Sequence, residues 1–267
     1  MLNSIKLFFK NLIPIQPLYV ELDSGGKHKP AIILLHGIAA TSKTWDSLIK
    51  EIDLKKYRVI SIDLLGFGKS PKPINCGYTI EDHIKYIRKT IKKLKVDKPY
   101  KIVGHSMGSI IAARYCRMYF KEIDKIYLLS LPLYFKEDEL HTKISRKHTD
   151  LFLKIYDFIS HKKKFTISSS QNLRKFLRID DGIEVNDETW DSFRLSLRNT
   201  IIKQNTYDDI NNLDTPIEII YGALDQFMVQ ENIAKLAIFS NVNVTKLNFV
   251  DHSISSRFAK KVAEIIA

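Results

Sequence analysis

Residues 101–110 read K-I-V-G-H-S-M-G-S-I, and this stretch decides the fold. Strand-like residues lead to a serine between two glycines, and apolar residues at helical spacing follow. Ser106 therefore lies in a sharp turn from a strand into a helix, where only small neighbours leave room for the backbone. The N-terminus of the following helix directs backbone N–H groups at the same place. The stretch predicts a nucleophilic serine at the edge of an α/β sheet.

Short apolar runs alternate with segments of helical periodicity on both sides of this turn. We expect strands at residues 31–35, 57–62, 99–103, 126–131, 216–221 and 242–249, with a weaker edge strand at 18–22. We expect helices at residues 44–52, 79–94, 107–120, 231–239 and 255–265. Strands that are apolar throughout, alternating with helices, are typical of a mostly parallel, doubly wound α/β sheet covered on both faces.

The strand pattern is interrupted between Pro132 and Thr215, where the chain is polar and mostly helical in spacing. We predict an α/β core made of residues 1–131 and 216–267, with residues 132–215 inserted as a helical cap. Apolar side chains recur in the insertion at helical spacing, and we expect them to pack the cap onto the core or to line a pocket. They are Leu151, Phe152, Ile155, Tyr156, Phe158, Trp190 and Phe193.

The chain of 267 residues carries a formal charge of +12. An excess of this size can indicate a nucleic-acid partner. However, residues 132–215 are neutral, with 14 basic and 14 acidic residues, and much of the excess lies on and just after the predicted helix 79–94. No zinc-finger or RNA-binding signature accompanies it. We interpret the charge as a solvated helix face and predict no nucleic-acid partner.

Two cysteines, Cys76 and Cys116, are too few for a disulfide framework and form no metal-binding motif, which predicts a reduced, cytoplasmic location. The N-terminal residues 1–15 are apolar but interrupted by Lys6 and Lys10. They are too short a run for a membrane span, so we predict no stable membrane insertion and expect an amphipathic helix that packs on the protein or touches a membrane. The oligomeric state stays open.

A serine hydroxyl needs a base within reach, and the base needs an acid to orient it. In this architecture the chain order is Ser, then Asp or Glu, then His. Asp225 follows the strand predicted at 216–221, and His252 follows the final strand. Taken singly, Asp225 could cap a helix and His252 could be a surface loop residue. Together they lie at strand ends, at the same edge as Ser106, and predict a catalytic triad.

Ester chemistry also needs two donors for an oxyanion. We expect the backbone N–H of Met107, after the nucleophile, and that of Ile38, in the loop after the strand at 31–35. We expect His105 to flank Ser106 but to point away from it. The residues predicted to support the turn and this loop are His36, Gly37, Gly104, His105 and Gly108.

The chain resembles members of the α/β-hydrolase superfamily. The resemblance is carried by L-L-H-G at 34–37, D-L-L-G-F-G-K-S at 63–70 and G-H-S-M-G at 104–108, with the contexts of the predicted acid and histidine. It is similar to capped carboxylesterases and to hydrolases of aromatic ring-fission products. The resemblance implies that Asp63 braces the loops at the sheet edge. Haloalkane dehalogenases and epoxide hydrolases of the superfamily carry aspartate where this chain has Ser106, which disfavours their chemistry.

We therefore expect hydrolysis of a small-molecule carboxylic ester with an apolar or aromatic acyl group, through an acyl-enzyme and without metal or organic cofactor. Three alternatives stay open. One is a carbon–carbon bond hydrolase, placed second because residues 37–40 lack the extra glycine and proline of many ring-fission hydrolases. Another is an acyltransferase or perhydrolase. The last is a ligand receptor that keeps the triad and turns over slowly.

Overall fold

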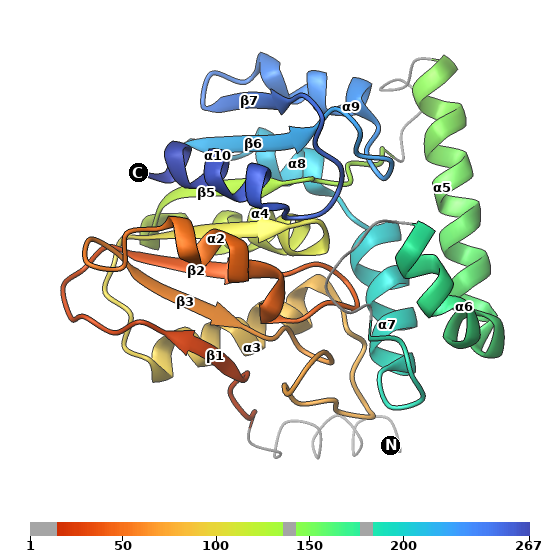
Figure 1. Cartoon of the computed structure of the whole chain (residues 1–267), viewed down its shortest axis with the longest axis horizontal. Helices are drawn as coiled ribbons and strands as arrows, with labels where there is room; N and C mark the ends of the chain where they lie inside the picture. Colours follow the sequence, from red (N-terminus) through yellow and green to blue (C-terminus); the bar gives the residue numbers. More distant parts are fainter. Residues whose placement is uncertain (1–14, 136–142, 177–183) are drawn as a thin grey trace, which may run out of the picture.

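The computed structural model describes residues 15–135, 143–176 and 184–267 (Figure 1). The amphipathic segment considered at the N-terminus lies almost wholly outside these residues. One seven-stranded sheet has the order β1-β3-β2-β4-β5-β6-β7, in which β1 is antiparallel to β3 and the other neighbours are parallel. The strands are β1 (Val20–Asp23), β2 (Ala31–Leu35), β3 (Arg58–Ile62), β4 (Tyr100–His105), β5 (Ile123–Leu129), β6 (Ile217–Gly222) and β7 (Val242–Leu247).

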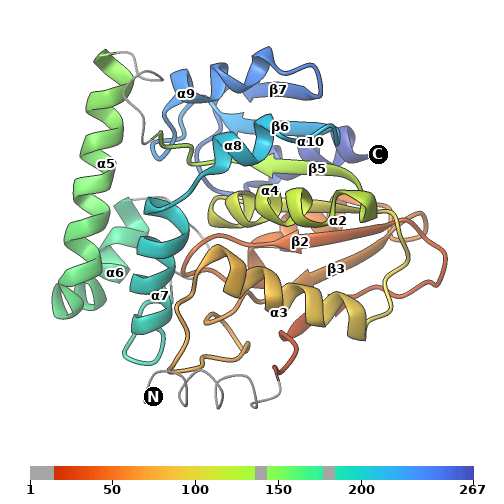
Figure 2. The ribbon, with the colours of Figure 1, turned by 180° about the vertical axis from the view of Figure 1, so that it is seen from behind.

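Helices cover both faces of the sheet, which confirms the predicted doubly wound architecture. Helices α2 (Asp46–Glu51) and α10 (Ser256–Ile266) lie on one face (Figure 1). On the other face lie α3 (Ile80–Lys93), α4 (Met107–Tyr119) and α8 (Thr206–Asn211), which Figure 2 shows from behind. The shorter helices are η1 (Ser42–Trp45), η2 (Phe120–Glu122), α9 (Gln230–Ala234) and η5 (Leu236–Ile238).

Alternating strand residues divide the core into two halves. Ile33 and Leu35 of β2 belong to the cluster packed under α3 and α4, whereas Ile32 and Leu34 belong to the cluster under α2 and α10. All four side chains are fully buried. Because successive side chains of a strand point to opposite faces, a strand covered on both sides must be apolar throughout. This is why the run of apolar residues in the sequence was a reliable strand signal.

Some predicted boundaries were wrong, for local reasons. The helix expected at 44–52 begins as the 3₁₀ turn η1, capped by the Thr41 side chain, and continues as α2. The helix expected at 231–239 is divided into α9 and η5. The last strand ends at Leu247 rather than at Phe249, whose φ of 59° is incompatible with extended pairing.

The segment between β5 and β6 carries α5 (Lys143–His161), α6 (Lys163–Phe176), α7 (Trp190–Ser196) and the π-helical turn η4 (Leu197–Ile202). These elements lie beyond the carboxyl ends of the parallel strands, with α5 outermost (Figure 1). Side chains of α7 and η4 bond to the core: Ser192 Oγ to the Gly66 carbonyl at 2.7 Å, Asn199 Nδ2 to the Gly77 carbonyl at 2.7 Å and Thr200 Oγ1 to the Tyr78 carbonyl at 3.0 Å. Thus α7 and η4 are fixed to the sheet edge, and α5 packs on them from outside.

Candidate active site

Ser106 lies in the turn between β4 and α4 with φ 53° and ψ −118°, a conformation rare for a residue with a side chain. The surroundings impose it: the Ser106 N–H donates a 2.9 Å hydrogen bond to the Leu129 carbonyl of the neighbouring strand. A Cβ on Gly104 would collide with the carbonyl of Gly108, and a Cβ on Gly108 would collide with the carbonyl of Leu35. The two glycines therefore allow β2, β4 and α4 to meet closely enough to form this turn.

His252 and Asp225 come together in the loops after β7 and β6. His252 Nδ1 lies 2.9 Å from each carboxylate oxygen of Asp225, and both residues are buried. Burial alone raises the pKa of Asp225, but the imidazole and the hydrogen bonds to the carboxylate outweigh it and hold that pKa below its ordinary value. An ionised carboxylate keeps the proton of neutral His252 on Nδ1, so Nε2 is the nitrogen able to accept a proton.

Ser106 and His252 line one cavity. In the described part of the chain no hydrogen bond joins the Ser106 hydroxyl to the His252 ring. Such a contact often tightens only when substrate binds. The structure thus places the three predicted residues at one edge of the sheet, with the Asp–His pair formed and the Ser–His pair open.

His105 contacts the loop that carries His252. Its ring lies 4.9 Å from that of His252, and its Nε2 is 2.8 Å from the His252 carbonyl, so it packs against the histidine loop and lines the cavity. Burial lowers the pKa of His105 to about 3, so the ring is neutral. Because a carbonyl only accepts, the proton of this ring is on Nε2, which donates to the His252 carbonyl. Phe227 also packs edge-on against His252, with ring centroids 4.7 Å apart. The sequence could not predict either contact, because each joins the loop after β7 to a residue far from it in the chain.

The predicted oxyanion donors are close to Ser106 in the fold. Met107 is the first residue of α4, where N–H groups have no partner within the helix. Ile38 lines the cavity, and its N–H donates no backbone hydrogen bond within the described residues. Gly37, before it, approaches so closely that an added Cβ would lie 3.2 Å from the Ser106 Cβ.

Two buried polar residues hold the loops around this edge. His36 Nε2 accepts from the Leu64 N–H at 2.8 Å, which leaves the Nδ1 proton to donate to the Gly37 carbonyl at 2.7 Å. Burial lowers the pKa of His36 to about 4, so it is neutral near pH 7. Asp63 accepts from the Ser42 backbone and hydroxyl at 2.8 and 2.7 Å. The loop after β2 is therefore tied to the turn after β3.

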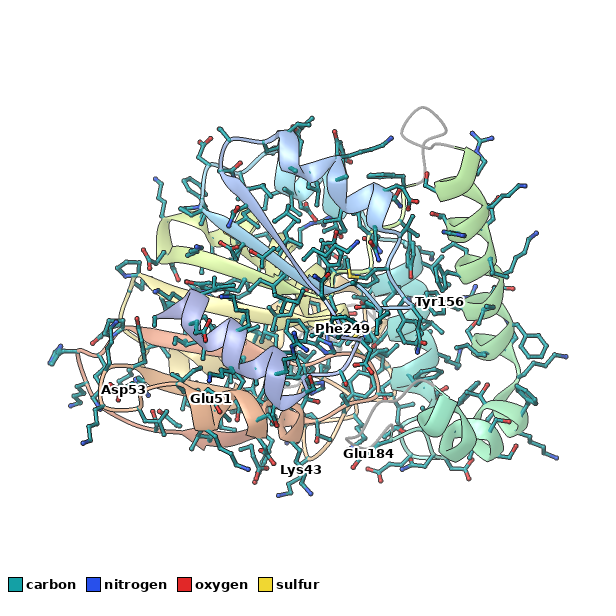
Figure 3. The ribbon with its side chains drawn as sticks, turned by 45° about the horizontal axis from the view of Figure 1, so that its top comes forward. Lys43, Glu51, Asp53, Tyr156, Glu184 and Phe249 are labelled. Atoms are coloured by element: carbon teal, nitrogen blue, oxygen red, sulfur yellow. The ribbon has the colours of Figure 1, made fainter. Side chains whose placement is uncertain are left out.

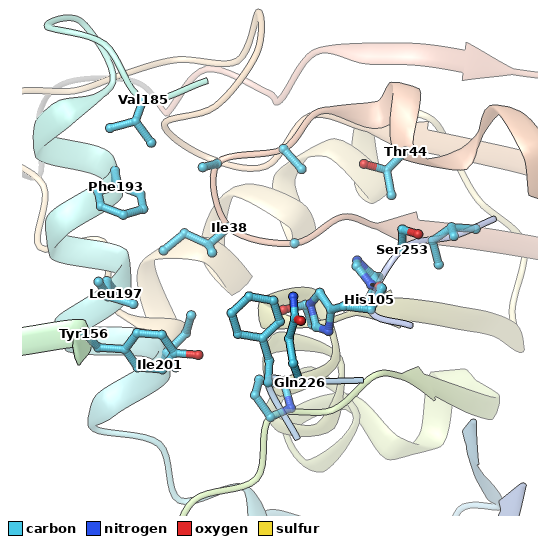
Figure 4. Close-up of a pocket in the computed structure, with 18 of the residues that line it drawn as sticks. Ile38, Thr44, His105, Tyr156, Val185, Phe193, Leu197, Ile201, Gln226 and Ser253 are labelled. Carbon is cyan, nitrogen blue, oxygen red and sulfur yellow. Dashed lines mark hydrogen bonds between the residues drawn. The ribbon is translucent and has the colours of Figure 1, made fainter. Parts of the chain in front are cut away.

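The cavity beside Ser106 has a volume of about 590 Å³ (Figure 4). Its wall opposite the sheet edge is apolar and comes largely from the segment between β5 and β6, with Phe152, Tyr156, Phe193, Leu197 and Ile201. In Figure 4 the last three project from consecutive turns of α7 and η4, and Figure 3 shows Tyr156 between α5 and the core. The expectation for two other residues was wrong, because Leu151 and Phe158 are exposed.

Within the described ranges, no group of three or more His, Cys, Asp or Glu side chains could hold a metal ion. The same residues include no helix that is long and apolar enough to cross a bilayer.

Comparison with known proteins places the chain in a family. The family model described as alpha/beta hydrolase fold matches residues 30–254. The probable lysophospholipase BODYGUARD 4 of Arabidopsis thaliana is 36% identical over 121 residues, which cover 43% of this chain and 28% of that protein. Matches to the first curated relatives span only 24% to 30% of their lengths.

Solved structures agree on the fold. A bromoperoxidase from Bacillus anthracis superposes with a TM-score of 0.70 at 23% identity, covering 96% of this chain and 95% of its own. An esterase from Exiguobacterium antarcticum gives 0.67 at 18% identity, covering 93% of each chain. At these identities the likeness concerns architecture alone. Because the family model matches most of this chain, from residue 30 to residue 254, the chain belongs to the α/β hydrolase fold family.

Proposed function

We propose that this protein is a serine hydrolase that cleaves carboxylic esters with apolar acyl groups. The observation that carries the proposal is the Asp225–His252 pair, whose histidine lines one largely apolar cavity together with a serine in a strained strand-to-helix turn. A Ser, Asp, His set of this kind activates a hydroxyl for acyl transfer.

In the proposed mechanism the Ser106 oxygen attacks the ester carbonyl while His252 Nε2 takes the hydroxyl proton. Asp225 holds the resulting imidazolium through Nδ1. The N–H groups of Met107 and Ile38 stabilise the negative oxygen of the tetrahedral intermediate. His252 then gives its proton to the leaving alcohol, and the acyl group remains on the serine. A water molecule, deprotonated by His252, releases the acid and restores the hydroxyl.

The cavity suggests the class of acyl group. Its walls carry aromatic and branched apolar side chains, and its volume of about 590 Å³ is within the usual range for small-molecule sites. An apolar chain or ring gains free energy by leaving water for such a surface. Similarity to a probable lysophospholipase is consistent with an acyl ester substrate. We propose that the helices of residues 132–215 act as the cap that forms this wall.

The competing functions differ in what accepts or releases the acyl group. A carbon–carbon hydrolase, an acyltransferase or perhydrolase, and a slow receptor could all use the same three side chains. No described contact favours any of them over the esterase. We also retain the prediction of a cytoplasmic location, which depends on the cysteine content.

A panel of p-nitrophenyl esters of increasing acyl length tests the proposal. We expect steady turnover, with kcat/KM rising from the acetate to medium-length chains as more apolar surface is buried. Release of one equivalent of p-nitrophenol per protein, with no further turnover, would instead indicate a receptor. Turnover confined to a ring-fission dienoate would indicate the carbon–carbon reaction and would refute the ester proposal.

A further inference from the structure

The outer side of α5 carries large apolar side chains that are exposed in the described part of the chain. Leu151, Ile155 and Phe158 are three or four residues apart and therefore share one side of the helix. Their exposed fractions are 55%, 44% and 47%. Phe165 of α6, 54% exposed, extends the patch through an edge contact with Phe158, the ring centroids being 5.5 Å apart. We call these four residues the outer stripe. Contiguous exposed apolar residues of this kind mark an interaction surface.

Lysines flank the outer stripe. Lys147 and Lys154 lie one turn from Leu151 on the same side of α5. Lys162 lies in the break between α5 and α6, and Lys164 directly precedes Phe165 in α6. All four are exposed, and in the described part of the chain none has a carboxylate within ion-pair distance.

The two acidic residues of α5 lie to one side of the outer stripe. Asp150 and Asp157 are seven residues apart and so share one side of the helix, next to two of the lysines: Asp150 is three residues from Lys147 and four from Lys154, and Asp157 is three from Lys154. Asp157 pairs with His161, whose Nδ1 is 3.5 Å from a carboxylate oxygen. The four flanking lysines thus outnumber the two acidic residues of α5, and among the described residues no ion pair joins the two sets.

We propose that the outer stripe and its four lysines bind an anionic lipid surface. Leucine, isoleucine and phenylalanine side chains can enter the boundary between head groups and acyl chains, while lysines neutralise the lipid phosphates. A second copy of the chain fits less well. A two-fold interface through this stripe would bring the lysines of both copies together.

The stripe also borders the cavity. Ile155 is half-exposed and lines the cavity, and Phe152, Tyr156 and Ile159 line it from the inner side of the same helix. A lipid surface bound to the outer side therefore lies one helix away from the cavity. An apolar substrate dissolved in that surface has a short path past Ile155. Lipid binding itself does not depend on the proposed function, because it uses neither Ser106 nor its partners.

Helix α3 supplies a matched control. Lys85, Lys89, Lys92 and Lys93 are exposed along it, yet none of its large apolar residues is exposed. A surface that attracts lipid by charge alone would include α3. A surface that also needs apolar insertion would be confined to α5 and α6.

The test is co-sedimentation of the full chain carrying Ser106→Ala with vesicles, so that no lipid is hydrolysed. Vesicles contain phosphatidylcholine alone or an equal mixture with phosphatidylglycerol. We expect the mixture to bind at least about tenfold more tightly, and salt to weaken the binding. Leu151→Ser with Phe158→Ser should weaken it about tenfold, and Lys147→Gln with Lys162→Gln by a similar factor. Lys85→Gln with Lys89→Gln, and Ile238→Ser at another exposed apolar site, should change it by less than about twofold.

Circular dichroism verifies that each variant is folded. Equal binding by the parent and the Leu151/Phe158 variant would overturn the proposal, as would equal losses from the α3 lysines. If vesicles do not bind, and sedimentation equilibrium shows a dimer that the Leu151/Phe158 change dissociates, the stripe joins two copies instead. Turnover of a water-soluble p-nitrophenyl ester by the same stripe variants with Ser106 intact tests the active site separately, so the two proposals can fail independently.

Discussion

Both carboxylate oxygens of Asp225 lie 2.9 Å from Nδ1 of His252, although strand β7 separates the two residues in the chain. Asp225→Asn should lower kcat for p-nitrophenyl butyrate by about 10⁴-fold, because an amide no longer fixes the Nδ1 proton or stabilises the imidazolium. KM should change little. Asp251→Asn is the matched control, since Asp251 bonds only to Ser253 in this loop. Equal losses in the two variants would contradict the assignment of the acid.

Replacement of the proposed nucleophile gives the second prediction. Ser106→Ala should lower kcat by about 10⁶-fold without lowering the melting temperature by more than a few degrees. In the unchanged protein, mass spectrometry should find an organophosphonate adduct on Ser106. Ser253, which also lines the cavity, provides the control, and Ser253→Ala should keep most activity. An adduct on any other residue would refute the nucleophile.

The wall formed by η4 should set the acyl length. Leu197→Trp fills part of the cavity beside Phe193 and Ile201, so kcat/KM for a decanoate ester should fall at least tenfold. The acetate ester needs little of this space, and its kcat/KM should stay within about twofold of the unchanged protein. A parallel loss for both esters would mean that the substitution disturbs the triad rather than the pocket.

Close packing at the turn that carries Ser106 leads to a stability prediction. Gly108→Ala places a methyl group against the backbone carbonyls of Leu35 and His36, which cannot move without breaking the sheet. The free energy of unfolding should fall by about 3 kcal/mol or more. Gly77→Ala is the comparison, because its nearest atoms are the side chains of Asp82 and Thr79 at 3.2 and 3.4 Å. Thermal denaturation should rank Gly108→Ala as far more damaging.

Burial of His36 makes stability depend on pH. Its pKa is lowered to about 4 in the folded protein, so acid protonates the unfolded chain first. The stabilisation is complete above the ordinary histidine pKa of about 6.5 and is lost as the pH falls to about 4, a change of about 3 kcal/mol from this group. In His36→Gln, which can still accept from Leu64, urea unfolding should show a flatter pH dependence over this range.

Much of the site could be predicted because its determinants are local. The turn at Ser106 needs small residues two positions away on each side, and this requirement is visible in five letters of sequence. Asp225 and His252 each follow a strand, and parallel strands bring their ends to one edge. The contact between His105 and His252 could not be predicted, since it depends on how two loops pack.

The helical insertion was harder to predict than the sheet. Helical spacing showed that α5 is amphipathic, but Leu151 and Phe152 are adjacent in the chain and differ in their surroundings. When both sides of a helix carry apolar residues, their periodicity does not predict which side packs on the core. The π-helical turn η4 was also not predicted, because its backbone is set by bonds from Asn199 and Thr200 to the loop before α3.

The path from β5 to β6 has a wider consequence. Helix α8 alone suffices to return the chain across the sheet, as any parallel crossover requires. Helices α5 to α7 and η4 are therefore an embellishment of one loop, attached where the chain leaves the strand ends. Replacing these helices by others would change the wall of the cavity, and so which molecules fit it. Ser106, Asp225 and His252 would keep their places at the sheet edge. Proteins that share this sheet can therefore differ in the ligands that they accept by differing in this segment alone. The same segment is a suitable unit for grafting between them.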